Sequence, residues 1–249
     1  MIATVVFDLD DTLYDEIEYC RSGFAAVAEF LAGSSGMSLD FARDACARTA
    51  APACSAAGTP AAARIFDALW GQFTAGNRSK TFDAALDKLG IDYDRERIVE
   101  LVGVYRNHVP TIALPPDSEE VLRKLRAKYA LALLTDGFLP AQQLKVQALG
   151  IEEYFASIVY TEQLGRESWK PSPAGFEKIL HDLGGRPENT VYVADNEQKD
   201  FIAPNRMGFA TVQLLRPARV HTSALAGPGA AAHHVISQIS ELPALVETL

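Results

Sequence analysis

The sequence predicts an α/β fold, in which a doubly wound parallel sheet carries an inserted α-helical domain. Strand-length apolar runs rich in branched residues recur along the chain without alternating with polar residues. Such runs are typical of strands buried on both faces of a parallel sheet. Helical patterns separate the runs after residue 117, whereas only helical patterns lie between the first run and the second. The five runs are Thr4–Phe7, Ala130–Leu134, Ser157–Tyr160, Thr190–Ala194 and Ala210–Leu215.

The segments between the later runs carry the start and stop signals of helices. Residues 116–129 offer Asp117 or Ser118 as an N-cap, with acidic residues in the first turn and basic residues in the last, as the helix dipole favours. Residues 140–150 and 172–185 have proline near the start and glycine at the end, which is the expected asymmetry. Strand and helix therefore alternate along this half of the chain.

A long helical insertion follows the first strand. An insertion of this length is expected to form a small domain of its own. We therefore predict a sheet domain from residues 1–15 and 113–249 and a helical domain from residues 16–112. The Ala-rich stretch 45–63 is either a loop or a weak helix. The helices expected in the insertion are Glu16–Leu31, Leu39–Arg48, Ala61–Thr74, Thr81–Leu89 and Arg95–Val109.

The composition argues against a protein that binds nucleic acid or spans a membrane. The chain has 249 residues, of which 48% are hydrophobic, and a formal net charge of -9. Such acidity gives no general attraction for nucleic acid polymers or anionic membranes, so an anionic ligand needs local positive groups. The cysteines Cys20, Cys46 and Cys54 match no metal-ligand spacing, and no apolar run is long enough to span a membrane. No basic leader precedes the first strand, so we expect a cytoplasmic protein.

Polar residues follow the strands at the points where the strands end. In open parallel sheets, ligands bind at the carboxyl ends of the strands, and these ends meet at one edge. We therefore expect a pocket that contains several carboxylates, one hydroxyl group and one ammonium group. In chain order, the residues are Asp8, Asp10, Thr135, Asp136, Lys170, Asp195 and Asp200.

Clustered carboxylates in a dry pocket need a neutralising partner, because otherwise their pKa values rise. Mg²⁺ takes oxygen ligands, usually one or two carboxylates together with water and substrate phosphate. Asp8 and Asp195, on neighbouring strands, can supply two carboxylates, and Lys170 adds a local positive charge. A carboxylate can attack phosphorus to form an aspartyl-phosphate, while a second carboxylate transfers protons. Asp8 and Asp10, two residues apart, can divide these tasks.

Four motifs, in this order, resemble those of the haloacid dehalogenase (HAD) superfamily. They are "DLDDT" at 8–12, Thr135 in "LLTDG", Lys170 in "WKPSP" and "VADNEQKD" at 193–200. The resemblance implies a Rossmann-like catalytic core and identifies the helical insertion as a subclass I (C1) cap that closes over the substrate. Asp10 gives motif one its phosphatase form, because the dehalogenases of the superfamily lack a second Asp at this position. The implied activity is Mg²⁺-dependent hydrolysis of a small phosphorylated metabolite.

The resemblance also implies a role for each matching residue. Asp8 would be the nucleophile and a metal ligand. Asp10 would be the general acid/base and would offer its backbone carbonyl to the metal. Thr135 would bind the phosphoryl group through its hydroxyl, with help from the backbone N–H of Asp136. Lys170 would neutralise both the nucleophile and the transferring phosphoryl group.

The remaining motif residues complete the implied site. Asp195 would complete the metal site, Asp200 would support Lys170 or the metal-bound waters, and Thr12 would have a supporting role. Two positions depart from the family pattern. Ala194 stands where relatives often have Gly, which is a small change. Asp136 stands where many have Asn, and its negative charge could weaken phosphate binding or favour a particular substrate.

Two other functions are compatible with much of this pattern. A phosphomutase would use the same catalytic residues but return the phosphoryl group to its substrate. A phospho-accepting signalling module also uses an acidic pair, a Thr and a Lys on a parallel sheet. Such modules place the accepting Asp after a middle strand, where this chain reads "YTEQLG", and they lack a long insertion. The pattern therefore favours an enzyme.

Overall fold

The structure of the chain is a computed structural model, and it describes residues 1–34, 58–222, 227 and 229–249. The helix expected at Leu39–Arg48 lies outside the described residues, as do Cys46 and Cys54. None of the helices in the described ranges has the length and apolar content that a bilayer crossing requires.

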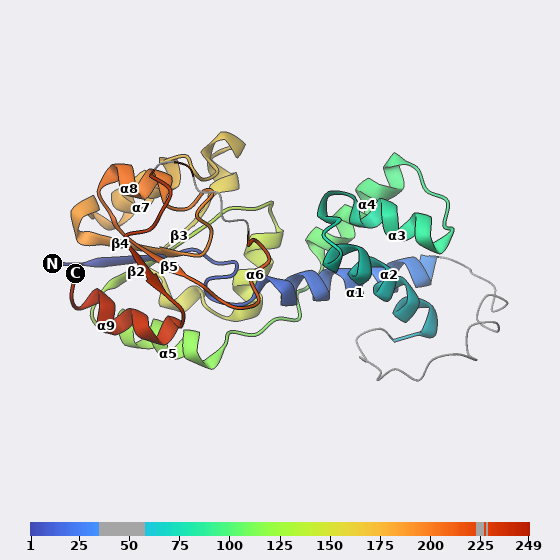
Figure 1. Ribbon diagram of the computed structural model, residues 1–249, viewed down its shortest axis with the longest axis horizontal. Helices are drawn as coiled ribbons and strands as arrows, with labels where there is room; N and C mark the ends of the chain where they lie inside the picture. The colour runs from blue at the N-terminus through green and yellow to red at the C-terminus, as the bar shows by residue number, and fades with distance from the viewer. Residues whose placement is uncertain (35–57, 223–226, 228) are drawn as a thin grey trace. The chain divides into compact units, whose positions relative to one another are not determined.

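The chain forms two compact units, which are described separately here. The sheet unit consists of Met1–Tyr19 and Thr111–Leu249, and the helical unit is Cys20–Pro110. Helix α1 (Glu16–Ser34) begins in the sheet unit and continues into the helical unit. In Figure 1, where colour follows residue number, the sheet unit contains the blue N-terminal and the red C-terminal segments, so it is built from both ends of the sequence.

The sheet unit is built on a 6-stranded parallel sheet with the order β3-β2-β1-β4-β5-β6. The first strand lies in the middle, where Val5 pairs with Leu131 on one side and with Val191 on the other. The strand order runs outward in both directions from this point, which confirms the predicted doubly wound α/β sheet. The strands are β1 (Thr4–Phe7), β2 (Ala130–Thr135), β3 (Ser157–Tyr160), β4 (Thr190–Ala194), β5 (Ala210–Leu214) and β6 (His234–Ile236).

Helices cover both faces of this sheet (Figure 1). Helices α7 and α8 lie on one face and α5 and α9 on the other, while α6 follows the end of β2. The face beneath α7 is filled by buried aromatic rings, among them Phe176 and Tyr192, whose centroids are 4.8 Å apart. The helices are α5 (Pro116–Arg126), α6 (Ala141–Leu149), α7 (Ala174–Leu183), α8 (Ile202–Met207) and α9 (Leu242–Val246).

Glycine residues end several of these helices in the left-handed conformation. Helix α6 stops at Gly150, which has φ 65°, and α7 stops at Gly184, which has φ 60°. A residue without a Cβ adopts this conformation at little cost, and its N–H satisfies carbonyls of the last turn. Each helix therefore ends a few residues before the next strand of the sheet, β3 after α6 and β4 after α7.

The helical unit is held together by an aromatic cluster. Phe24 of α1 contacts rings from three other helices, and its centroid is 5.2 Å from that of Tyr105. The chain also supplies helix caps, because Thr59 accepts a hydrogen bond from Ala62 N at 3.2 Å. The helices of this unit besides α1 are α2 (Pro60–Thr74), α3 (Thr81–Leu89) and α4 (Arg95–Asn107).

A glycine substitution in α1 tests this packing. A Cβ added at Gly23 would lie 2.5 Å from the ring of Tyr105, which is itself packed against Phe24 and Phe82. We expect Gly23→Ala to lower the free energy of unfolding by about 1–3 kcal/mol, because overpacking forces the aromatic cluster apart. Chemical denaturation measures the change.

Gly71→Ala in α2 is the matched control, because among the described residues no atom beyond its chain neighbours and its own helix backbone lies within 4 Å of its added Cβ. It should leave stability unchanged or raise it by up to about 1 kcal/mol through helix propensity. Equal effects of the two substitutions would contradict the packing argument.

Candidate active site

The carboxyl ends of β1 and β4 place two aspartates side by side. Asp8 follows β1 directly and Asp195 follows β4 directly, and the backbone N–H of Asp8 still donates to Val193 O at 2.9 Å. The side chain of Gln213 donates to Asp195 O at 3.0 Å and fixes that backbone from β5. One carboxylate oxygen from each of Asp8, Asp195 and Asp200 lies within 4.8 Å of the others, and all three residues are buried.

Lys170 neutralises part of this acidic cluster. Its Nζ lies 2.5 Å from Asp8 Oδ1 and 2.7 Å from Asp200 Oδ1, and it also donates to Tyr192 OH at 3.0 Å. These three contacts use all three protons of the ammonium group, so its position is well defined. A buried charge is tolerated only when it is paired in this way.

Asp200 is held as an ionised carboxylate. Its second oxygen accepts a hydrogen bond from Asn196 N at 3.0 Å. Burial alone would raise the pKa of Asp200, but the charges of Lys170 and Lys199 outweigh burial and lower that pKa below its usual value. Asp200 thereby supplies a fixed negative charge that orients Lys170.

The other two carboxylates of the cluster lack sufficient compensation from the chain. Burial, with the charges of Asp200 and Asp8, raises the pKa of Asp195 to about 9. Burial also raises the pKa of Asp8 to about 7, although Lys170 opposes the increase. Among the described residues, none donates a hydrogen bond to the buried Asp195 Oδ2. Adjacent hard oxygen donors, one of them without a partner, fit a divalent cation held by Asp8 and Asp195.

The end of β2 supplies a hydroxyl group and a second acidic residue. Thr135 is buried, and its Oγ1 accepts a hydrogen bond from Gln142 at 2.6 Å. The carboxylate of Asp136 accepts from Thr161 Oγ1 at 2.8 Å and from the backbone N–H of Lys170 at 3.2 Å, and Lys199 Nζ lies 3.4 Å from its other oxygen. The charge of Asp136 is therefore paired, and its carboxylate anchors the loop that carries Lys170.

Asp10 takes part in a different set of contacts. Its carboxylate accepts hydrogen bonds from Tyr14, Gln142 and Lys145. Burial would raise the pKa of Asp10, but the charge of Lys145 outweighs it, so the pKa lies below its usual value. Beside this group, burial and the charge of Asp10 raise the pKa of Glu16 to about 8.

Asp11, which the sequence assigns to the turn and not to the chemistry, holds the turn after β1. It has φ 54°, an uncommon value for a residue other than glycine, and it is buried. Its carboxylate accepts from Glu16 N at 2.9 Å and from Val220 N at 2.6 Å. Arg216 supports the same turn by donating to Thr12 O at 3.0 Å. The buried Thr12 Oγ1 has no hydrogen-bond partner among the described residues.

Several residues that contact the site were not predicted from the sequence, and one of them, Lys199, lies within the fourth motif itself. The spacing of Gln142 and Lys145, three residues apart in α6, places both on one face of that helix and is the one local signal that could have indicated them. No periodicity indicates Lys199 or Arg216, because their partners lie far away in the sequence. The residues missed are Tyr14, Gln142, Lys145, Thr161, Lys199 and Arg216.

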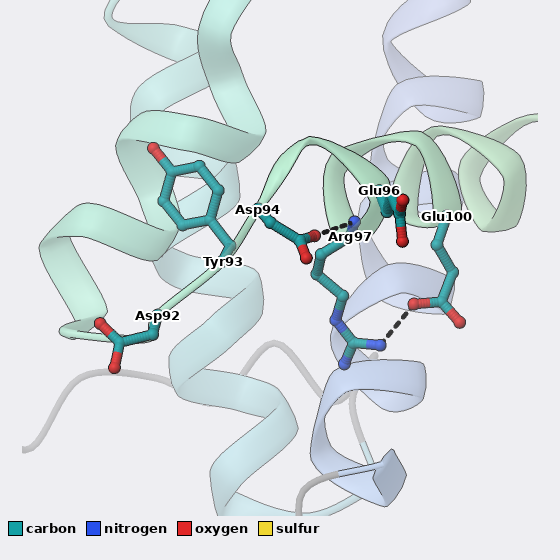
Figure 2. A pocket seen from close by; sticks show the side chains of 6 residues that line it. All are labelled: Asp92, Tyr93, Asp94, Glu96, Arg97 and Glu100. Atoms are coloured by element: carbon teal, nitrogen blue, oxygen red, sulfur yellow. Dashed lines mark hydrogen bonds and ion pairs between the residues drawn. The ribbon is translucent and has the colours of Figure 1, made fainter.

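The helical unit has a pocket of its own, which contains none of the motif residues (Figure 2). Its lining is predominantly acidic, so it would repel a phosphate group. Two of its charged groups already serve the local structure, since Asp94 caps α4 and Arg97 pairs with Glu100. The lining residues are Asp92, Tyr93, Asp94, Glu96, Arg97 and Glu100.

The raised pKa of Asp195 predicts how stability changes with pH when no metal is bound. Between pH 4 and pH 9, roughly, the folded state retains a proton on Asp195 that the unfolded state has released. The free energy of unfolding should therefore fall, relative to that of Asp195→Asn, as pH rises through this window. Urea unfolding in EDTA at several pH values measures this difference, and parallel pH curves for the two proteins would contradict the assignment.

Comparison of the chain with known proteins identifies its family. The family described as haloacid dehalogenase-like hydrolase matches residues 2–208. A glyceraldehyde 3-phosphate phosphatase from Methanopyrus kandleri is 29% identical over 222 residues, covering 87% of this chain and 85% of that protein. A phosphoserine phosphatase from Thermus thermophilus is 30% identical over 231 residues, covering 86% of this chain and 89% of that protein.

Solved structures show the same fold. A HAD phosphatase from Thermococcus onnurineus aligns with a TM-score of 0.56 and 22% identity, over 99% of this chain and 98% of that chain. This likeness supports the architecture of a parallel sheet with helices on both faces. Together with the match over residues 2–208, it confirms the resemblance carried by the four motifs: the chain belongs to the haloacid dehalogenase-like hydrolases and is an enzyme of that family.

Proposed function

We propose that this enzyme is a Mg²⁺-dependent phosphatase that hydrolyses the phosphate monoester of a small metabolite through an aspartyl-phosphate on Asp8. The buried arrangement of Asp8, Lys170, Asp195 and Asp200 at the centre of the sheet edge carries the proposal. It combines a carboxylate nucleophile, a fixed ammonium group and an oxygen site that fits a hard cation. These are the components that phosphoryl transfer requires.

In the first step, a carboxylate oxygen of Asp8 attacks the phosphorus atom, and the bond to the leaving oxygen breaks. The negative charge of the bound phosphate favours protonation of Asp10, and the protonated Asp10 donates its proton to that oxygen, so the alcohol leaves in its neutral form. Water then attacks the aspartyl-phosphate while Asp10 accepts a proton from it, which releases phosphate and restores Asp8. Mg²⁺, when held by Asp8, Asp195 and the backbone carbonyl of Asp10, supplies positive charge that offsets the repulsion between carboxylate and phosphate.

Three further groups hold the transferring phosphoryl group in this proposal. The hydroxyl of Thr135 and the backbone N–H of Asp136 donate hydrogen bonds to its oxygens, and Lys170 neutralises their charge. The pairing of Asp136 with Thr161 and Lys199 supports this role, because the carboxylate beside that N–H is compensated. Asp200 keeps Lys170 in place, and Thr12 supports the turn after β1.

The proposal also assigns a separate role to each of the two units. Residues 1–15 and 113–249 form the catalytic core, and residues 16–112 form the cap that contributes substrate selectivity. The names of the relatives, a glyceraldehyde 3-phosphate phosphatase and a phosphoserine phosphatase, support a small phosphorylated metabolite as substrate. The net charge of -9 favours such a substrate over a nucleic acid polymer.

Activity measurements test the nucleophile and the cation together. We expect release of inorganic phosphate from 4-nitrophenyl phosphate, glyceraldehyde 3-phosphate or phosphoserine in the presence of Mg²⁺, and loss of that activity with EDTA. Asp8→Asn should lower kcat by at least about 10³-fold, because the nucleophile is removed while the fold is kept. Free phosphate also distinguishes hydrolysis from the return of the phosphoryl group to substrate by a phosphomutase.

Asp182→Asn is the matched control, because this carboxylate lies on α7 and pairs with the exposed Lys178. It should keep the activity of the unmodified enzyme. Full Mg²⁺-dependent turnover by Asp8→Asn would show that the proposed mechanism is wrong.

A further inference from the structure

The carboxylate of Asp10 is held on both oxygens by donors from the chain itself. Tyr14 OH and Lys145 Nζ lie 2.5 and 2.8 Å from Oδ1, and Gln142 Nε2 and Lys145 Nζ each lie 2.9 Å from Oδ2. An ionised carboxylate accepts about four hydrogen bonds, so these contacts fix both its position and the plane of the group. None of the four motifs contains Gln142 or Lys145.

Lys145 is placed in an environment that suits a positioning role. Its side chain is only 4% exposed, on a helix face where Val146 and Leu149 are also buried. Its Nζ also lies 4.1 Å from the ring centroid of Tyr19. An ammonium group in such surroundings loses its hydration and needs a carboxylate partner in return. Asp10 is that partner, so the two side chains hold each other in place.

Gln142 connects Asp10 to the hydroxyl of Thr135. Its Nε2 lies 2.9 Å from Asp10 Oδ2, 2.6 Å from Thr135 Oγ1 and 2.9 Å from Asp136 O. Thr135 Oγ1 accepts a hydrogen bond from this amide and donates only a long one, of 3.5 Å, to Asp136 O, so a phosphoryl oxygen can replace that acceptor. One side chain therefore orients two groups that the proposed reaction uses.

Gly137 provides independent evidence that the position of Gln142 matters to the loop after β2. A Cβ at residue 137 would lie 2.7 Å from Gln142 Cδ and 2.8 Å from its Cγ, and the backbone there has φ 144°. Any larger residue would have to displace Gln142. Both the backbone conformation and the space that the glutamine occupies therefore favour glycine after Thr135-Asp136.

We propose that Gln142 and Lys145 form a positioning site for catalysis: Lys145 fixes the general acid/base carboxylate of Asp10, and Gln142 links that carboxylate to the phosphoryl-binding Thr135. The inference rests on the proposed phosphatase function and deepens it. The two residues lie three positions apart on one face of α6, so the helix acts as a rigid support that joins the turn after β1 to the end of β2.

Two substrates with different leaving groups can distinguish a positioning role of Lys145 from a general loss of folded structure. An alkyl phosphate needs a proton from Asp10 as its alkoxide departs, whereas 4-nitrophenolate departs without one. Loss of Lys145 also raises the pKa of Asp10, so each protein is measured at its own pH optimum. There we expect Lys145→Met to lower kcat/KM for an alkyl phosphate such as phosphoserine by at least about 30-fold, and for 4-nitrophenyl phosphate by less than about threefold. A loss of folded protein would lower both values by the same factor.

Further variants keep the test decisive. Tyr14→Phe removes one donor to Asp10 without a change in volume, and it should shift the ratio of the two kcat/KM values in the same direction by a smaller factor. Asp10→Asn removes the proton donor itself, so it should give the largest change in the ratio of the two kcat/KM values. Lys178→Met on α7 removes an exposed lysine that also pairs with a carboxylate, and it should leave both values unchanged.

The outcomes distinguish the inference from the function on which it rests. If Asp8→Asn is inactive while Lys145→Met and Tyr14→Phe keep the unmodified ratio, the positioning role is wrong and the phosphatase proposal stands. If Asp8→Asn also retains full activity, both fail. A ratio that moves toward that of Asp10→Asn in both variants supports the positioning role.

Discussion

The buried ammonium of Lys170 is the interaction on which the site depends. It lies among carboxylates that belong to different strand ends, and it contacts Asp8 after β1 and Asp200 after β4. Without a cation, those carboxylates would repel one another in a region of low dielectric constant. Because Lys170 itself follows β3, one side chain ties three strand ends into a single edge. The acidic chain therefore concentrates positive charge at the point where an anionic substrate would be handled.

The central position of β1 explains why the turn after it needs its own supports. Asp8 and Asp10, which follow this strand, pair with different lysines: Asp8 with Lys170 and Asp10 with Lys145. The turn that follows these two carboxylates contains Asp11 in an uncommon conformation, with φ 54°. The buried carboxylate of Asp11 then fixes the turn through hydrogen bonds to Glu16 N and Val220 N.

The sheet was predictable to a large extent because its strands are buried on both faces. The strands at Thr4–Phe7 and Thr190–Ala194 have the bounds that their apolar runs predict. The expected strand list omitted β6 (His234–Ile236), an edge strand whose Val235 is 56% exposed and which therefore lacks a continuous apolar run. The helix expected at 116–129 ends at Arg126, since the chain turns there to enter β2. Local hydrophobicity thus predicts buried elements better than edges and helix ends.

The sequence by itself determined which residues follow each strand, and therefore which chemical groups reach the edge of a parallel sheet. The order of the motifs also carried the family resemblance that the comparisons confirm. Only the tertiary structure decided the partners of those groups: Lys145 and Gln142 for Asp10, and Lys199 for Asp136. These partners are separated by 135, 132 and 63 positions along the chain, so no local periodicity relates them. Their contacts arise because each buried carboxylate needs an opposite charge or a hydrogen-bond donor, and the packed helices and loops decide which one lies within reach.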